Sequence, residues 1–194
     1  MTSVLDSKAH VRKILSEKRR RMTPEAREAA SLVIVERLIA ETAYQRAKTI
    51  FVFCSMPEEV QLQAFYRDAL DHGKQLAFPV CGKGGKMEAY IPEDWEHMLP
   101  DRYGIPSPSP EKDRLLFPDG IDLIVVPMLG FDRELFRIGY GGGYYDRYLL
   151  RLREDADAIG VSYARQEMPH IPRESFDRSL PLILTELERL AGEP

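Results

Sequence analysis

The stretch DLIVVPML, residues 122–129, decides the fold class. It is a nearly continuous apolar run, which is typical of a strand that is covered on both faces and lies inside a parallel sheet. A helix over about residues 61–71 separates two other candidate strands, which predicts a β-α-β unit with parallel strands. The remaining strand candidates are TIFVFC (49–54), QLAFPV (75–80), AIGVSY (158–163) and LILTEL (182–187). The sequence therefore predicts an α/β fold, a three-layer α/β/α sandwich around a mainly parallel sheet.

Two N-terminal helices are expected before the first strand. In DSKAHVRKILSEKRRRM, residues 6–22, apolar side chains share one face and basic side chains crowd the other. Asp6 or Ser7 is available as the N-cap of this helix. The TPE triplet at residues 23–25 supplies a cap, a first-turn proline and a first-turn acid, so a second helix is predicted to start there.

Length and composition indicate one globular domain. The chain has 194 residues, a hydrophobic share of 44% and a net charge of -4, and we expect a single domain over residues 1–194. An acidic chain has no general attraction to nucleic acid or to an anionic membrane. No apolar run approaches the roughly 18–20 residues of a membrane span, and the N-terminus lacks the apolar core of a signal peptide, so a cytoplasmic location is expected. Cys54 and Cys81 are too few for a disulfide framework or a zinc site, and buried, inert thiols are predicted.

The stretch RIGYGGGYYDRYL, residues 137–149, carries the first functional signal. It puts four glycines in five residues, where main-chain N–H groups can approach a ligand, just before a segment that is compatible with a helix over about residues 142–153. A phosphate-binding loop is predicted, with an ordinary tight turn as the alternative. The loop is neither a GxxxxGK[ST] P-loop nor a full dinucleotide fingerprint. GKGGK at residues 82–86 is expected to be a flexible hairpin or loop, because no suitable helix follows it.

FD at residues 131–132 together with RIGYGGGYYDRYL resembles the signature of the 5-formyltetrahydrofolate cyclo-ligase family, also called methenyltetrahydrofolate synthetases. The resemblance continues in SMPEEVQ (55–61), GKQLAFPV (73–80), IDLIVVPMLGFD (121–132) and FDRSLPLILTE (176–186). It implies an enzyme that uses ATP and magnesium to convert 5-formyltetrahydrofolate into 5,10-methenyltetrahydrofolate, with release of ADP and phosphate. In the family's mechanism the formyl oxygen attacks the γ-phosphate, N10 then closes the ring, and phosphate departs. Such a protein has mainly to position its substrates and neutralise charge.

The resemblance also implies the nucleotide and metal contacts. Lys8 and Arg12 are four residues apart and share a helix face, where both can meet nucleotide phosphates. Asp146 and Asp177 match magnesium ligands, whose hard oxygen atoms suit this ion; Asp146 also fits an ordinary first-turn helix acid. The basic residues 18–21 are expected to be a solvated surface. The expected ATP contacts are Lys8, Arg12, Arg137, Ile138, Gly139, Tyr140, Gly141, Gly142, Gly143, Tyr144 and Tyr145, with Arg137 and Tyr144 as catalytic candidates.

The folate side is implied by the same resemblance. The expected folate contacts are Arg12, Met56, Glu59, Gln61, Tyr140, Gly141, Gly142, Gly143 and Tyr144. Carboxylate or amide groups at residues 59 and 61 can pair with the donor-rich pterin edge, and the methionine offers a deformable apolar contact. A capped helix start is the alternative for this segment. Tyr90 and Trp95 are aromatic candidates for the pocket, or else core residues.

Three departures from the family pattern bear on the folate side. Leu135 stands where the family commonly has glycine, Ser107 stands where it often has an acid, and Gln61 stands where some members carry an acid. The turn at residue 135 must therefore be made differently. A relative that binds ATP but acts on another substrate, or has a regulatory role, stays open. A nucleic-acid-binding role for the basic first helix is disfavoured, because no stacking aromatics interleave its charges. We expect a monomer that binds neither nucleic acid nor membranes.

Overall fold

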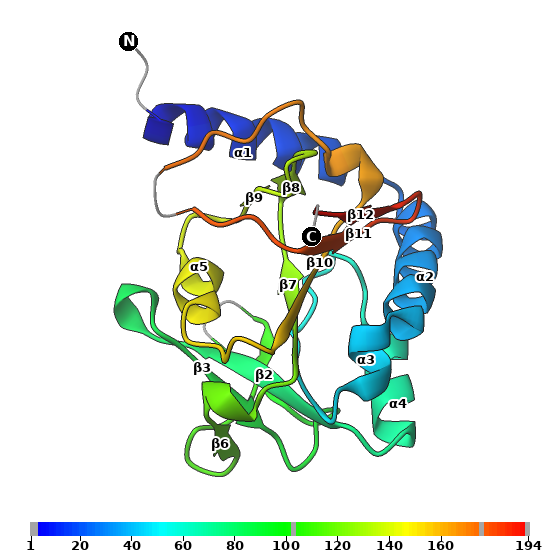
Figure 1. Ribbon diagram of the computed structural model, residues 1–194, viewed down its shortest axis with the longest axis vertical. Helices are drawn as coiled ribbons and strands as arrows, with labels where there is room; N and C mark the ends of the chain where they lie inside the picture. Colours follow the sequence, from blue (N-terminus) through cyan, green and yellow to red (C-terminus); the bar gives the residue numbers. More distant parts are fainter. Residues whose placement is uncertain (1–3, 102–103, 175–176, 193–194) are drawn as a thin grey trace.

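An eight-stranded sheet forms the centre of the protein (Figure 1). The computed structural model describes residues 4–101, 104–174 and 177–192. The strand order is β12 (Arg189–Ala191), β11 (Leu182–Leu184), β10 (Asp157–Val161), β7 (Leu123–Pro127), β1 (Thr49–Phe51), β2 (Gln75–Cys81), β3 (Met87–Ile91) and β6 (Arg114–Leu116). The five strands from β11 to β2 are parallel, whereas β12, β3 and β6 are antiparallel at the two edges. The predicted mainly parallel sheet is confirmed.

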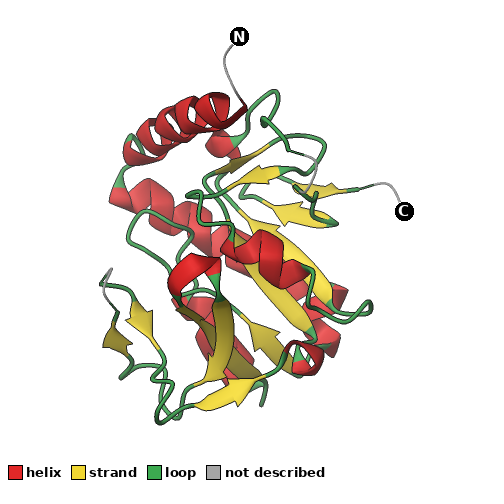
Figure 2. Cartoon of the chain, turned by 90° about the vertical axis from the view of Figure 1, so that its left-hand side faces the viewer, coloured by secondary structure: helices red, strands yellow, loops and turns green. Residues whose placement is uncertain are grey.

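Helices cover both faces of the sheet, as Figures 1 and 2 show. One face carries α2 (Pro24–Ala40), α3 (Thr42–Arg46) and α4 (Gln63–Asp71), and the other carries the short α5 (Tyr144–Leu149). Strand β7 is buried against both layers, because Leu123 and Val125 belong to the core under α2 to α4, while Ile124 and Val126 belong to the core under α5. This alternation explains the continuous apolar run and confirms the three-layer arrangement.

Helix α1 (Val4–Arg20) lies across the end of the sheet to which β7 leads (Figure 1). Its apolar residues Val11 and Leu15 pack against Leu129 and Ile138. The predicted N-cap is wrong, because the helix begins at Val4, before both Asp6 and Ser7; the side chain of Asp6 is outside the described part. The predicted start of α2 is confirmed, since Thr23 Oγ1 accepts a hydrogen bond from Ala26 N at 3.2 Å.

Within the described residues, two small two-stranded sheets and three 3-10 turns occupy the connections. The sheets pair β4 (Leu99–Pro100) with β5 (Pro106–Ser107) and β8 (Gly130–Phe131) with β9 (Arg137–Ile138). The turns are Lys83–Gly85, Pro118–Gly120 and Ala164–Gln166. The first of them joins β2 to β3, which confirms a hairpin at GKGGK. No helix in the described ranges combines the length and the apolar character needed to cross a lipid bilayer.

Several predicted boundaries are wrong. The helix expected at residues 142–153 is only the six-residue α5, because Arg151 N bonds Tyr148 O in a tight turn. The strand expected at 49–54 ends at Phe51. The strand expected at 182–187 ends at Leu184, because Thr185 Oγ1 accepts bonds from the N–H groups of residues 187 and 188 and reverses the chain into β12.

Candidate functional site

Helix α1 presents a stripe of cationic side chains to the end of the sheet. Lys8, Arg12 and Arg19 are four and seven residues apart, so they lie on one face of the helix together with the buried Leu15. Lys8 and Arg19 are 7% and 2% exposed, whereas Arg20 is exposed. We call these three residues the α1 stripe. Such burial requires polar partners for the charged groups.

The first partner of the α1 stripe is the glycine loop, residues 139–143, which connects β9 to α5. Arg12 Nε donates a hydrogen bond to the carbonyl of Gly139 at 2.9 Å. Gly141 and Gly143 have φ values of 99° and 62°, a left-handed region that favours glycine. Arg12 thus holds the loop at its start, and left-handed turns at two positions fix its path into α5.

Arg137 precedes the loop, and its guanidinium is buried. Its side chain is 5% exposed, its Nη2 donates to Asp146 Oδ1 at 2.5 Å, and its Nη1 donates to the carbonyl of Arg178 at 3.1 Å. Burial lowers the pKa of Arg137, while the charges of Asp146 and Asp177 act in the opposite direction. Both candidate metal ligands therefore lie close enough to Arg137 to act on it.

Lys8 links the α1 stripe to the second of these carboxylates. Its Nζ contacts Asp177 Oδ2 at 2.6 Å and Glu174 Oε2 at 2.8 Å. Burial lowers the pKa of Lys8, but the hydrogen bonds to Asp177 and Glu174 outweigh it and raise the pKa overall. Asp177 also accepts from Glu174 N at 2.7 Å. Phe176, which belongs to the same sequence motif, is outside the described residues.

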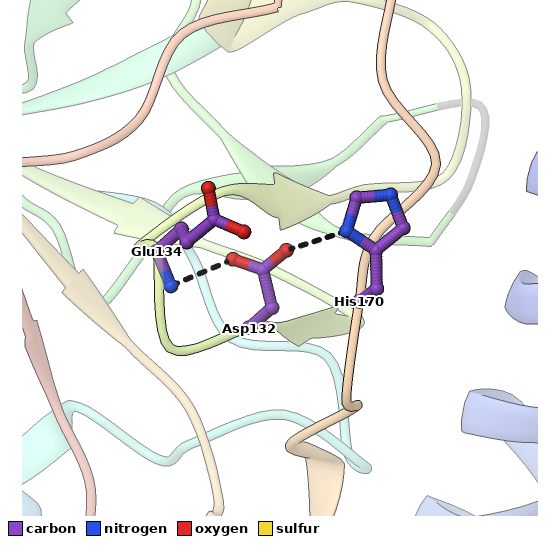
Figure 3. A group of neighbouring side chains, drawn as sticks. All are labelled: Asp132, Glu134 and His170. Carbon is purple, nitrogen blue, oxygen red and sulfur yellow. Dashed lines mark hydrogen bonds and ion pairs between the residues drawn. The ribbon is translucent and has the colours of Figure 1, made fainter.

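The aspartate of the FD pair holds the turn before β9 in place. Figure 3 shows this residue with two of its neighbours. Asp132 is 1% exposed and lies beside Glu134 and His170, a grouping of ligand types that could hold a metal ion. Arg173 already pairs with both carboxylates, at 2.9 Å from Asp132 and 2.7 Å from Glu134. Asp132 also accepts hydrogen bonds from the backbone N–H groups of Glu134, Phe136 and Ile171, at 2.9 to 3.1 Å. It therefore organises the turn that leads into β9.

The loop after β1 carries the predicted folate contacts. Glu59 is 6% exposed, and its Oε2 accepts from Met56 N at 3.0 Å. Burial raises the pKa of Glu59, although the bond from Met56 and the charge of Arg19 oppose the shift. The amide of Gln61 donates to the carbonyls of Met56 and Glu59 at 2.8 and 2.7 Å, so it braces the loop from within. Glu58, in the same loop, lies 3.6 Å from the guanidinium of Arg19.

The tyrosines of the glycine stretch point to three different places. Tyr140 is 56% exposed and accepts a hydrogen bond from Arg19. Tyr144 donates to the carbonyl of Gly82 at 3.3 Å, which ties the loop to the β2–β3 hairpin. The ring of Tyr145 stacks on Phe51 with centroids 6.4 Å apart, and burial raises the pKa of its hydroxyl well above the usual value. Trp95 packs edge-on against Tyr66, with ring centroids 5.3 Å apart.

The site therefore combines the α1 stripe, the glycine loop, two carboxylates around Arg137 and a loop with a buried glutamate. The model of the 5-formyltetrahydrofolate cyclo-ligase family matches residues 4–186. This chain belongs to that family. The cyclo-ligase of Mus musculus is 29% identical over 200 residues, covering 95% of this chain and 96% of the mouse protein. The cyclo-ligase of Escherichia coli (strain K12) is 25% identical over 175 residues, covering 89% and 96%.

Solved structures agree with the family assignment. The 5,10-methenyltetrahydrofolate synthetase of Aquifex aeolicus superposes with a TM-score of 0.82 at 27% identity, covering 95% of this chain and 92% of that one. The synthetase of Mycoplasma pneumoniae has the same fold, with a TM-score of 0.77 at 23% identity and coverage of 92% and 98%.

Arg19 is a residue of the candidate site that the sequence prediction missed. It was expected on the surface with the rest of residues 18–21, and that expectation is wrong for Arg19. Its guanidinium bonds Tyr140 and lies 5.6 Å from the centre of that ring. Its Nε and Nη1 are buried without a hydrogen-bond partner among the described residues. The signal was available, because Arg19 continues the spacing of Lys8 and Arg12 on one helix face.

The departures from the family pattern are accommodated locally. Leu135 has φ of 64° and is the one non-glycine residue with positive φ in the described ranges, so it makes the turn that glycine commonly makes. Ser107 donates to the carbonyl of Pro79 at 3.3 Å.

Cys54 and Cys81 are not joined in a disulfide, and both are half-buried, less enclosed than predicted. Burial raises the pKa of Cys54 to about 12, which keeps it a neutral thiol.

Proposed function

We propose that this chain is a cyclo-ligase that converts 5-formyltetrahydrofolate into 5,10-methenyltetrahydrofolate, using ATP and magnesium and releasing ADP and phosphate. One observation carries the proposal: Arg12 and Arg19 of the α1 stripe contact the glycine loop, Arg137 precedes it, and the loop that holds Glu59 lies next to it. Membership of the cyclo-ligase family supports the same reaction. We further propose that it acts as a single domain and a monomer in the cytoplasm.

The nucleotide would lie along the glycine loop. The side chains of Lys8, Arg12 and Arg137 supply positive charge there, and the loop supplies backbone N–H donors without side chains in the way. A Cβ at Gly139 would meet no atom within 4 Å, so this side of the loop is open to a ligand. The residues that flank the loop fix its two ends through buried contacts; they are Arg137, Ile138 and Tyr145.

Asp146 and Asp177 fit a magnesium ion. Both are carboxylates near Arg137, and each is held by one basic partner, Arg137 or Lys8. Hard carboxylate oxygens that leave room for water and phosphate are what magnesium prefers. When bound, the ion would neutralise negative charge on the phosphates.

The residues on the folate side orient the formyl group. Burial raises the pKa of Glu59, and its carboxyl group, which accepts a hydrogen bond from Met56 N, can pair with the pterin edge. Met56 and Tyr140 flank this position, and Tyr144 stands between the loop and the hairpin. The formyl oxygen attacks the γ-phosphorus as the bond to ADP breaks. N10 then attacks the formyl carbon, the C–O bond breaks to release phosphate, and the N10–H bond breaks as its proton passes to the departing phosphate. Arg137 neutralises the charge that develops on the transferred group.

The appearance of the methenyl product, followed by its absorbance, tests this proposal. Wild-type protein with 5-formyltetrahydrofolate, magnesium and ATP is expected to turn over only when ATP is present. Asp146→Asn should lower kcat/KM at least tenfold, about 1.4 kcal/mol in barrier terms. Asp155→Asn is the matched control, because its side chain is 80% exposed and pairs with Arg153. Absence of turnover in the wild type would overturn the proposed function.

A further inference from the structure

The segment between the last 3-10 turn and β11 carries the candidate metal ligand Asp177. We call its described residues, 168–174 and 177–181, the strap (orange in Figure 1). These residues form neither a helix nor a strand, so regular secondary structure does not fix their path. Ile171 is 1% exposed and packs into the core under helix α1. The backbone of such a segment needs partners elsewhere in the protein, and those partners decide where Asp177 lies.

The turn that contains the FD pair supplies these partners. We call residues 131–135 the FD turn. Three backbone N–H groups of the strap donate to it at 2.8 to 3.0 Å; the pairs are Met168 to the carbonyl of Phe131, Ile171 to the carboxylate of Asp132, and Leu180 to the carbonyl of Leu135. Two of these anchors precede Asp177 in the chain and one follows it. One turn therefore holds both ends of the segment that carries this carboxylate.

Arg173 adds a charged anchor between the strap and the FD turn. Its Nη2 donates to Asp132 Oδ2 at 2.9 Å and to Glu134 Oε1 at 2.7 Å. Its Nη1 donates to the other carboxylate oxygen of Glu134, also at 2.7 Å. The guanidinium lies 3.8 Å from the centre of the Phe136 ring. Such a fork of two parallel hydrogen bonds fixes the direction of a side chain as well as its distance.

The strap brings Asp177 to the candidate site directly after this anchor. Glu174 follows Arg173 in the chain, and its backbone N–H donates to the carboxylate of Asp177 at 2.7 Å. The carbonyl of the next residue, Arg178, accepts a hydrogen bond from Arg137 at 3.1 Å. A displacement of Arg173 would therefore move the N–H group that holds Asp177.

We propose that Asp132 and Arg173 are positioning residues for Asp177. They hold the strap on the FD turn and so place the carboxylate of Asp177 beside Arg137. Lys8, which pairs with this carboxylate at 2.6 Å, meets it from helix α1. The magnesium role of Asp177 rests on the proposed function, whereas its position does not. The buried aspartate of the FD pair thus acts on the site through Arg173 and the strap.

Amide hydrogen exchange, followed by NMR, tests the positioning without turnover. The Glu174 amide reports on Asp177 directly, because it donates to that carboxylate. In Arg173→Met this amide is expected to exchange at least about tenfold faster, because loss of the anchor makes local opening easier. Asp132→Asn should act in the same direction. Arg133→Met is the matched control, because Arg133 lies in the FD turn and pairs with two carboxylates outside the strap.

Binding of Mn²⁺ in the presence of a non-hydrolysable ATP analogue, measured by electron paramagnetic resonance, gives a second readout. Arg173→Met should weaken Mn²⁺ binding by about tenfold, while the calorimetric Kd for 5-formyltetrahydrofolate changes by less than about twofold. A general loss of structure would weaken both ligands. Arg173→Lys should recover part of the Mn²⁺ affinity, because an ammonium group bonds a carboxylate but cannot form the fork.

The outcomes separate the positioning from the proposed function. Faster exchange of the Glu174 amide with unchanged Mn²⁺ binding would uphold the positioning and remove the magnesium role of Asp177. Exchange that is unchanged in Arg173→Met, or equally accelerated in Arg133→Met, would overturn the positioning. Glu134→Gln decides the question if Arg173→Met does not fold, because it weakens the same fork at a side chain that is 67% exposed. Unchanged exchange in Glu134→Gln would then overturn the proposal.

Discussion

Replacing Leu135 tests whether the turn after the FD pair needs a left-handed residue. Leu135 has φ of 64° and is 4% exposed, so it combines backbone strain with a buried side chain. Its N–H donates to Asp132 O at 2.9 Å, and its carbonyl accepts from Leu180 N at 3.0 Å, which fixes the conformation. Leu135→Ala loses the side chain and keeps the strain, at a cost of about 2–5 kcal/mol. Leu135→Gly loses the side chain but removes a strain of roughly 1–2 kcal/mol.

The comparison of the glycine and alanine variants gives the magnitude. At an ordinary position glycine is about 0.5–1 kcal/mol less stable than alanine. At position 135 the relieved strain offsets this cost, so Leu135→Gly should be as stable as Leu135→Ala or up to about 1.5 kcal/mol more stable. Leu180 is the matched control, because it is 2% exposed in the same core and has negative φ.

Urea unfolding is measured for Leu135→Ala, Leu135→Gly, Leu180→Ala and Leu180→Gly. The urea concentrations at the unfolding midpoint are compared with the urea dependence of the free energy held constant. The glycine-minus-alanine difference should be about 1–2 kcal/mol more favourable at position 135 than at position 180. Equal differences at the two positions would refute the argument that Leu135 is strained.

Three further predictions concern the site. Gly139→Ala should leave the free energy of unfolding unchanged or raise it by up to about 1 kcal/mol, while the KM for ATP rises at least tenfold, because the added Cβ occupies open space on the ligand side. Arg19→Gln should lower kcat/KM for the folate by about 10- to 100-fold, since hydrogen bonds to charged groups contribute roughly 1.5–3 kcal/mol; steady-state kinetics measure it. Glu59→Gln should gain stability relative to the wild type as pH rises above about 4.3, the ordinary glutamate pKa, in urea unfolding at pH 4 to 7.

The sign of the Glu59 prediction follows from linkage. Burial raises the pKa of Glu59 in the folded protein, so above the unfolded pKa the folded state binds more protons than the unfolded state. The contribution of Glu59 to the free energy of unfolding of the wild type is therefore complete at low pH. It is lost as the pH rises through the pKa that Glu59 has in the folded protein. The isosteric glutamine does not titrate.

Specific results would contradict these three predictions. Arg20→Gln is the control for Arg19→Gln, because Arg20 is exposed on the same helix. Equal losses of kcat/KM in both variants would show that Arg19 contributes only its positive charge and makes no specific contact. A destabilised Gly139→Ala would show that the glycine serves the fold rather than the ligand. A stability difference between Glu59→Gln and wild type that is flat with pH would show that Glu59 titrates normally.

Periodicity predicted the parts of the fold that depend on burial. The run at residues 122–129 is apolar throughout because β7 is covered by helices on both faces, so its pattern reports its position directly. The cap at Thr23 is equally local, since it depends on three adjacent residues. Both features could be read without knowledge of distant contacts.

The errors arise where distant contacts decide. The segment after α5 has good helix formers, yet the helix stops at Leu149, and Arg153 beyond it bonds Asp122 Oδ1 at 2.6 Å and the carbonyl of Asp119 at 2.9 Å. Arg19 lies in a run of four basic residues that looks solvated, but the burial of this one member depends on Tyr140, 121 residues away. Composition could not separate Arg19 from its neighbours, whereas helix spacing could.

The fate of the formyl oxygen tests the proposed reaction most directly. The folate is labelled with oxygen-18 at the formyl group and incubated with the protein, magnesium and ATP, and the released phosphate is analysed by mass spectrometry. Attack of the formyl oxygen on the γ-phosphorus, followed by ring closure, predicts one labelled oxygen in each phosphate formed with the methenyl product. Methenyl product accompanied by unlabelled phosphate would contradict the account, because the formyl oxygen would then have left without passing through a bond to phosphorus.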